Sequence, residues 1–108
     1  MLEKDLEKIF TAEVKNAGGY AYKFTSPGND GVPDRIALLP DGRLVFVELK
    51  TGDGRLTRLQ KIQCQRISSI GQQVRVLHGL AEIADFFEEF DLEQSASKIR
   101  NRISRGQK

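Results

Sequence analysis

Two apolar runs joined by a short turn restrict the fold more than any other feature of the sequence. Residues 35–39 and 43–50 are rich in residues that favour β-strands, and Pro-Asp-Gly at 40–42 is a strong hairpin signal. A three-residue turn pairs Leu39 with Arg43, and opposed residues then have numbers that sum to 82. Because side chains alternate along a strand, the apolar residues of 43–50 occupy both faces, which predicts an interior strand.

A group of charged residues ends this predicted hairpin. In the expected register Asp34 lies opposite Glu48, and the Cβ atoms of directly opposed residues are about 4.5–5.5 Å apart. Two carboxylates at that distance repel each other and lose hydration, and a divalent cation between them removes the penalty. Lys50 shares the face of Glu48, whereas Leu49 points the other way. The pattern therefore predicts a metal-binding cluster at the end of an interior strand.

The rest of the sequence is typical of one α/β domain. Apolar residues at three- and four-residue steps predict a helix over 2–17, which Gly18-Gly19 ends. A strand over 20–24 and a glycine-rich loop over 25–33, expected to be exposed and mobile, precede the hairpin. A second glycine loop, a helix over 58–70, a strand over 73–78 and a helix over 80–90 follow. The predicted order is αβββαβα, in a domain of residues 1–93 followed by a basic tail at 94–108.

Composition excludes several other classes of protein. The 108 residues suffice for one domain with one modest core. No apolar run approaches the ~20 residues that span a bilayer. The single cysteine and single histidine exclude an intrachain disulfide and a zinc site of Cys and His ligands. A reducing cytosol is therefore the expected compartment, and any bound metal is expected to have mainly oxygen ligands.

Basic residues are unevenly distributed along the chain. Residues 95–108 hold five Lys/Arg and no acid, so the first 94 residues carry a net charge of −3, against +2 for the whole chain. Within those 94 residues, the segment 43–75 has seven basic residues and two acids. A basic middle and a basic tail fit a polyanionic partner such as DNA.

A known family matches these features. Gly31-x-Pro33-Asp34, thirteen further residues and Glu48-Leu49-Lys50 resemble the PD-(D/E)XK nuclease signature. The longer pattern SPGNDGVPDRIALLPDGRLVFVELK, followed by GRLTRLQ, resembles the virus-type replication–repair nuclease (VRR-NUC) family in particular, over residues 1–84. The resemblance implies a restriction-endonuclease-like fold, with a central mixed β-sheet flanked by helices. It also implies similarity to stand-alone phage members, which act inside a bacterial host.

The resemblance implies a reaction and roles for particular residues. Family members hydrolyse DNA phosphodiesters with Mg²⁺ or Mn²⁺. Asp34, Glu48 and the backbone carbonyl of Leu49 are therefore expected to hold the metal. Lys50 is expected to stabilise developing negative charge or to orient the attacking water. The alternative for Lys50 is a simple ion pair with Glu48.

Two further positions have two interpretations each. An additional catalytic acid usually comes from the first helix, where Glu3 and Glu7 share one face. Glu7, our preferred candidate, has a spacing to the end of the helix similar to that in archaeal junction-resolving relatives, whereas Glu3 better matches the family's acid near the start. The alternative for either residue is a solvated helix charge. Gln60 matches the family's glutamine, which is expected to hydrogen-bond the active-site water or Lys50. However, Thr57-x-x-Gln60 is also a capping box.

DNA contacts are expected just after the Glu-x-Lys motif. Gly52 and Gly54 allow a tight loop, and they also let backbone amides approach phosphates closely. Arg55, Arg58 and Lys61 follow this loop and supply positive charge.

Because stand-alone, phage-sized members of the family resemble Holliday junction resolvases, the resemblance implies a metal-dependent, structure-selective DNA endonuclease that resolves four-way (Holliday) junctions in DNA repair. Such a junction needs two opposed cuts, so a homodimer is expected. Phe86, Phe87 and Phe90 are expected in the core and are also candidates for the dimer interface. The alternatives are a nuclease that acts on flaps or other branched DNA, and a non-catalytic DNA-binding module on a nuclease fold. The intact acid–lysine motif argues against the second alternative.

Overall fold

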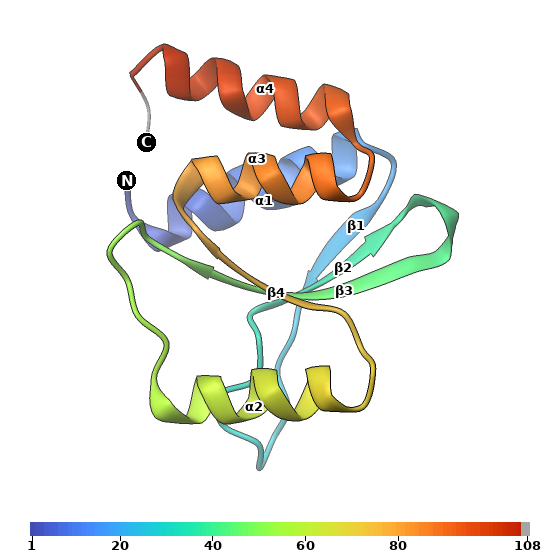
Figure 1. The fold of residues 1–108 in the computed structure, drawn as a ribbon, viewed down its shortest axis with the longest axis vertical. Helices are drawn as coiled ribbons and strands as arrows, with labels where there is room; N and C mark the ends of the chain where they lie inside the picture. The colour runs from blue at the N-terminus through green and yellow to red at the C-terminus, as the bar shows by residue number, and fades with distance from the viewer. Residues whose placement is uncertain (107–108) are drawn as a thin grey trace.

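The computed structural model describes residues 1–106, which form a four-stranded mixed sheet between layers of helices (Figure 1). The strands lie in chain order across the sheet: β1 (Tyr20–Lys23), β2 (Arg35–Leu39), β3 (Arg43–Lys50) and β4 (Val74–His78). The first three strands are antiparallel, and β4 is parallel to β3. The predicted α/β class and mixed sheet are confirmed.

The helices cover the two faces of the sheet unequally. The helices α1 (Glu3–Asn16) and α3 (Gly79–Glu89) cover one face, and α4 (Glu93–Ser104) packs on them as an outer layer (Figure 1). The helix α2 (Arg58–Ser69) alone covers the other face. No described helix is long and apolar enough to cross a membrane.

The hairpin has the predicted register. Leu39 pairs with Arg43, and Arg35 pairs with Val47. The turn at Pro40–Gly42 is short because Asp41 and Gly42 both adopt left-handed backbone angles, with φ of 67° and 75°. As predicted, β3 is an interior strand, since it pairs with β2 on one side and β4 on the other.

The core lies between the sheet and the layer of α1 and α3. Every fourth residue of α1 enters it, from Leu6 through Phe10 to Val14. The Phe10 ring contacts those of Phe86 and Phe87, with centroids 5.3 and 5.8 Å apart. Just before β1 the backbone at Gly19 packs closely against β2. A Cβ on Gly19 would lie 2.2 Å from the carbonyl oxygen of Leu38, so this position requires glycine.

The predicted dimer-interface role of the α3 phenylalanines is wrong. Phe86, Phe87 and Phe90 are all buried within the described chain. They form one aromatic cluster with Phe10, in which the Phe86 and Phe90 rings lie 4.9 Å apart. These side chains are covered by the protein's own helices and are not available to a second copy.

The predicted order αβββαβα lacks one helix, because most of the expected basic tail is α4. Ala96 and Ile99 of α4 are buried in the core, and Ile103 packs against its edge. The apolar face of α4 consists of these three residues only. Because charged residues lie between them, the helical periodicity was not recognised in the sequence. Residues 107–108 of the expected tail lie outside the described residues.

The basic residues of α4 are partly neutralised by neighbouring acids. Lys98 Nζ lies 3.7 Å from Glu13 Oε1 of α1. Arg100 Nη2 lies 3.1 Å from Asp85 and 3.0 Å from Glu88, both on α3. The two Arg100 pairs are exposed and orient α4 on its neighbours more than they stabilise it, whereas the Glu13 carboxylate that Lys98 contacts is buried.

Candidate active site

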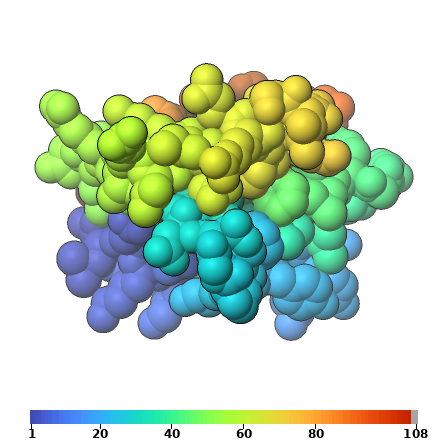
Figure 2. Space-filling model, turned by 90° about the horizontal axis from the view of Figure 1, so that it is seen from below, coloured from blue at the N-terminus to red at the C-terminus, as the bar shows by residue number. Residues whose placement is uncertain are grey.

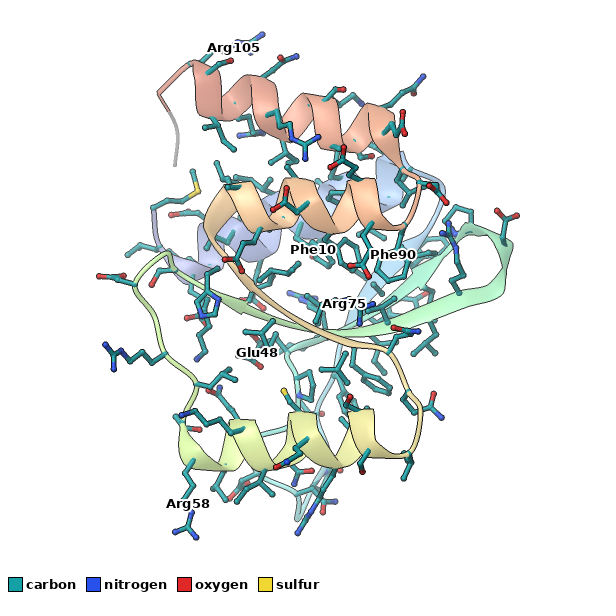
Figure 3. The ribbon with its side chains drawn as sticks, viewed as in Figure 1. Phe10, Glu48, Arg58, Arg75, Phe90 and Arg105 are labelled. Atoms are coloured by element: carbon teal, nitrogen blue, oxygen red, sulfur yellow. The ribbon has the colours of Figure 1, made fainter. Side chains whose placement is uncertain are left out.

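Three carboxylates meet where the hairpin ends. Glu3, Asp34 and Glu48 each offer an oxygen, and these atoms all lie within 4.8 Å of one another. Glu3 comes from the first turn of α1, Asp34 from the residue before β2, and Glu48 from β3. The Glu48 side chain lies between the sheet and α2 (Figure 3) and is 1% exposed. Three acidic groups are thus concentrated at a site where two are half-buried and Glu48 is shielded from water.

The hairpin register positions two of these acids. Because Arg35 pairs with Val47, Asp34 stands next to Glu48 just beyond the last paired residue of β2. The backbone N–H of Leu49 donates to Asp34 Oδ2 at 3.4 Å, and the N–H of Phe24 donates to the Asp34 carbonyl at 2.8 Å. Asp34 is therefore held from both neighbouring strands.

The third acid is Glu3, and the preference for Glu7 is not supported by the geometry. Glu7 Oε1 lies 3.4 Å from Arg35 Nε, outside the carboxylate cluster. Both acids lie on one face of α1, but a turn of helix moves a residue about 5.4 Å along the axis. The first turn of α1 therefore meets Asp34, and the second meets the next residue of the chain, Arg35.

Lys50 and Gln60 both contact Glu48. Lys50 Nζ lies 3.6 Å from Glu48 Oε2, and the lysine side chain is 11% exposed. Gln60 donates from Nε2 to the same oxygen at 3.2 Å, while its Oε1 accepts the N–H of Thr57 at 2.9 Å. The capping box is therefore confirmed, and the other end of the Gln60 amide holds Glu48, whereas Lys50 or the active-site water was the expected partner.

Glu48 has one oxygen that the protein does not satisfy. Its Oε1 is buried without a hydrogen-bond partner among the described residues. Burial raises the pKa of Glu48 to about 8, with a further contribution from the charge and hydrogen bond of Asp34, while Lys50 lowers it. A divalent cation would supply the missing partner, and a site of carboxylate oxygens suits Mg²⁺ or Mn²⁺. The residues present therefore fit the implied metal.

Metal binding is expected to depend on pH because of Glu48. A cation needs the ionised carboxylate, and a pKa near 8 leaves Glu48 largely protonated at pH 6 to 7 in the metal-free protein. Apparent Mn²⁺ affinity, measured by calorimetry, should rise about tenfold per pH unit up to pH 8 and then level off. An affinity that is constant from pH 6 to 9 would contradict this prediction.

The residues predicted to contact DNA follow the site directly. Gly52 and Gly54 lie in the loop after Lys50, and Arg55, Arg58 and Lys61 are exposed at the start of α2. Arg58 points away from the body of the protein (Figure 3). Their position beside the acids agrees with the predicted role, which stays a prediction.

Two other arginines of the basic segment 43–75 have structural partners instead. Arg43 Nη1 donates to the Phe90 carbonyl at 2.6 Å. Arg75 forms a two-pronged ion pair with Glu89, and its guanidinium lies 5.4 Å from the centre of the Phe90 ring (Figure 3). These two cations bind α3 to the sheet, so they do not add to a surface for DNA.

The loop over 25–33 contacts α2 through Asp30 and Gly31, while residues 27–30 are exposed as expected; its mobility stays a prediction. It lies against α2, as the cyan and yellow-green atoms of Figure 2 show. A Cβ on Gly31 would lie 2.6 Å from the backbone carbon of Leu59, and Gln63 Nε2 donates to the Asp30 carbonyl at 3.3 Å. The contact between Gly31 and Leu59 was not predicted from the sequence, although Gly31 belongs to the motif GVPD and Leu59 to the motif LTRLQ. Gly31 lets the loop carrying Asp34 pack on the helix carrying Gln60.

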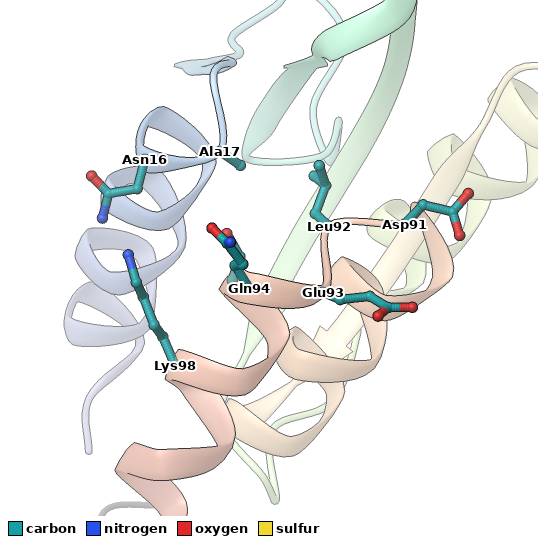
Figure 4. Close-up of a pocket in the computed structure, with 8 residues that line it drawn as sticks. Asn16, Ala17, Asp91, Leu92, Glu93, Gln94 and Lys98 are labelled. Carbon is teal, nitrogen blue, oxygen red and sulfur yellow. The ribbon is translucent and has the colours of Figure 1, made fainter.

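A separate hollow of about 250 Å³ lies at the far end of α1 (Figure 4). It separates Asn16 and Ala17 from the start of α4, with Gln94 and Lys98 on its wall. Since Glu3 stands at the opposite end of the same helix, this hollow is not part of the carboxylate site.

Comparisons with known proteins agree with the site. No protein-family model matches the chain. The chain is 45% identical over 75 residues to "Putative nuclease p44" of Acyrthosiphon pisum secondary endosymbiont phage 1, covering 69% of this chain and 81% of the phage protein. Its structure matches a solved "VRR_NUC domain" with a TM-score of 0.77 and 25% identity, over 82% of this chain and 96% of that domain. With Asp34, Glu48 and Lys50 in the expected arrangement, these matches show that the chain belongs to the VRR-NUC family of PD-(D/E)XK nucleases.

Proposed function

We propose that the protein is a Mg²⁺- or Mn²⁺-dependent DNA endonuclease that resolves four-way junctions. The observation that carries the proposal is the convergence of three carboxylates within 4.8 Å, beside a lysine that is almost buried. A structural role would leave this concentration of negative charge uncompensated, whereas a nuclease needs it to hold a cation. The phage relative suggests a phage- or prophage-encoded protein that acts on DNA in a bacterial cell.

The protein's residues have separate tasks in hydrolysis. Glu3, Asp34 and Glu48 would hold the cation, together with the Leu49 carbonyl. When bound, the cation supplies charge neutralisation at the phosphate and lowers the pKa of an attacking water. Lys50 carries a positive charge to the same place, where negative charge develops on the phosphate. Water adds to phosphorus, the P–O bond to the leaving oxygen breaks, and that oxygen takes up a proton.

Gln60 acts as a positioning residue in this proposal. It holds Glu48 Oε2 by a hydrogen bond, and α2 in turn holds Gln60 through the cap at Thr57. This arrangement leaves Glu48 Oε1, the oxygen without a hydrogen-bond partner among the described residues, as the atom that would bind the cation. The bond from Gln60 also reduces the rotational freedom of a ligand that must be in place before the phosphate arrives.

A cleavage assay with a panel of DNA structures tests the proposal. Duplex, single-stranded, flap and four-way junction DNAs are incubated with Mg²⁺, Mn²⁺, Ca²⁺ or EDTA. We expect cleavage with Mg²⁺ and Mn²⁺ only, since Ca²⁺ tolerates looser geometry than Mg²⁺. Among the DNA structures, the four-way junction is expected to be cleaved fastest. Activity in EDTA would contradict the metal mechanism. Equal cleavage of flaps and junctions would leave a nuclease without the proposed selectivity.

Lys50→Ala is expected to lower the single-turnover rate about a hundredfold or more while changing DNA affinity little. The ammonium contributes mainly where charge develops in the transition state, so its loss affects the chemical step. Lys50→Arg is the control, since it keeps the charge and should retain more of the rate. Weaker binding with an unchanged rate would make Lys50 an ordinary phosphate contact.

We further propose that the active form is a homodimer. Residues 1–106 offer one carboxylate site, which would cut one strand, whereas a pseudo-symmetric junction needs two opposed cuts. A two-fold dimer supplies two sites related by the matching symmetry. Sedimentation equilibrium, together with mapping of nicks on both arms, tests this. A monomer at micromolar concentration that nicks one strand per encounter would contradict the resolvase proposal and leave the nuclease intact.

A further inference from the structure

A row of lysines on α1 has no role in the site described above. Lys4, Lys8 and Lys15 are spaced by four and seven residues, so they lie along one face of the helix. All three are exposed, and none forms a hydrogen bond or ion pair with another described residue. Glu13, which pairs with Lys98, lies on the opposite, buried side of α1. The lysine row is thus a free cationic surface.

These lysines form one wall of a groove of about 430 Å³, which we call the α1 groove. Arg35 of β2 lies on its other wall, and Lys23 of the edge strand β1 pairs directly opposite Arg35. Glu7 is the one acid that lines the groove, and it lies 3.4 Å from Arg35. Positive charge therefore exceeds negative charge along the whole groove.

The groove also contains polar atoms without partners. Thr11 Oγ1 and Arg35 Nε are both buried and have no hydrogen bond within the described chain. Arg35 Nε is near Glu7 but not in hydrogen-bond geometry. A hydroxyl and a guanidinium N–H without acceptors, next to three unpaired ammonium groups, suit a ligand with several anionic oxygens.

The walls of the α1 groove include residues next to the cluster acids in the sequence. Lys4 follows Glu3 on α1, and Arg35 follows Asp34 at β2. From Lys4 to Lys15 the helix rises about 16 Å. One strand of duplex DNA has a phosphate about every 3.4 Å along its axis, so this length corresponds to about five phosphates.

We propose that the α1 groove binds the phosphate backbone of the DNA arm that leaves the active site along α1. This inference rests on the proposed function, since it takes the polyanion to be the DNA that is cut. It assigns the protein a second DNA surface besides the loop after β3 and the start of α2. Each surface includes residues close to the cluster acids in the sequence, so DNA bound to both surfaces would extend past the metal site on two sides.

A triple variant tests this assignment against a variant of equal charge. Lys4→Gln/Lys8→Gln/Lys15→Gln removes three charges from the groove. Lys98→Gln/Arg100→Gln/Arg105→Gln removes two charges from α4 and one from its C-cap, on the outer layer (Figure 3). DNA binding is measured in Ca²⁺ over a range of salt concentrations. Each lost phosphate contact lowers the log–log salt slope by about 0.9, so the groove variant should lose about 2.7. The α4 variant should keep the slope of the wild type.

Two further measurements make the result specific. Lys4→Arg/Lys8→Arg/Lys15→Arg should restore the slope, because arginine keeps the charge. Shortening the DNA to fewer than about five base pairs on one side of the cut should remove the difference between wild type and groove variant. The single-turnover rate at saturating DNA should change less than about twofold, because the groove lysines are proposed to contact phosphates other than the one that reacts.

The possible results separate this inference from the proposed function. A wild-type protein that binds DNA and cuts it, with an unchanged slope in the groove variant, overturns the groove assignment alone. Equal losses in the groove and α4 variants also overturn it, because net charge would then explain both. A wild-type protein that neither binds nor cuts DNA overturns the proposed function as well.

Discussion

Glu48→Gln is expected to lower the rate of DNA cleavage by at least about a thousandfold, equivalent to about 4 kcal/mol. Glutamine keeps the size of the side chain and its contact with Gln60, but it removes the charge that holds the cation. Asp34→Asn should have an effect of similar size, since the two acids share the site. DNA binding in EDTA should persist in both variants, because it depends on basic residues elsewhere.

The same substitution is expected to stabilise the metal-free protein at alkaline pH. The pKa of Glu48 is raised from 4.5 to about 8, so the folded protein favours the neutral carboxyl group. The contribution of the neutral Glu48 carboxyl group to the free energy of unfolding is then fully present below about pH 4.5. This contribution is lost as pH rises through 8. Glu48→Gln has no group to ionise and should escape a loss of about 3–5 kcal/mol between pH 5 and pH 9.

Thermal melting in EDTA at the two pH values measures this effect. Glu7→Gln is a suitable control, because Glu7 is an acid of the same helix face as Glu3 but lies outside the cluster. The control should retain both metal-dependent cleavage and the alkaline loss of stability. Added Mn²⁺ should stabilise the wild type at pH 9 and leave Glu48→Gln unaffected. Wild-type cleavage by Glu48→Gln would remove the basis of the proposed mechanism.

The parts of the fold that were predicted from sequence are those determined by local signals. The turn at 40–42 fixes the hairpin register, and the register alone brings Asp34 beside Glu48. Periodicity could not decide between Glu3 and Glu7, because residues four apart occupy the same face of a helix. The choice depends on where α1 lies along the sheet, which is set by packing of its buried face over many residues.

One missed helix accounts for the largest error. In α4 the apolar face consists of Ala96, Ile99 and Ile103, which is too sparse to stand out among charged residues. The phenylalanines at 86, 87 and 90 were predicted in the core and also as candidates for a dimer interface, and only the core prediction is confirmed. The helix that was interpreted as a tail is in fact part of the cover over α3.

A chain that ends at Leu92 is therefore expected to lose most of its stability. Ile99 is fully buried and Ala96 nearly so, and their removal uncovers apolar residues of α3. Ile99→Ala alone should reduce the free energy of unfolding by about 2–5 kcal/mol. Loss of the whole helix should exceed this and approach the total of about 5–15 kcal/mol typical of a domain. Urea unfolding followed by circular dichroism measures both changes.

Ser97→Ala is the matched control, since Ser97 is exposed on the same helix and its replacement should alter stability by no more than about 0.5 kcal/mol. A truncated chain that unfolds as cooperatively as the full one, with a similar midpoint, would show that α4 is dispensable.

The truncation also removes basic residues, so weaker DNA binding by it would not identify a DNA contact. Lys98→Gln/Arg100→Gln/Arg105→Gln resolves this ambiguity, because it removes charge from α4 while keeping Ile99 and the fold. We expect the truncation to lose folding and DNA binding together, and the charge variant to lose neither.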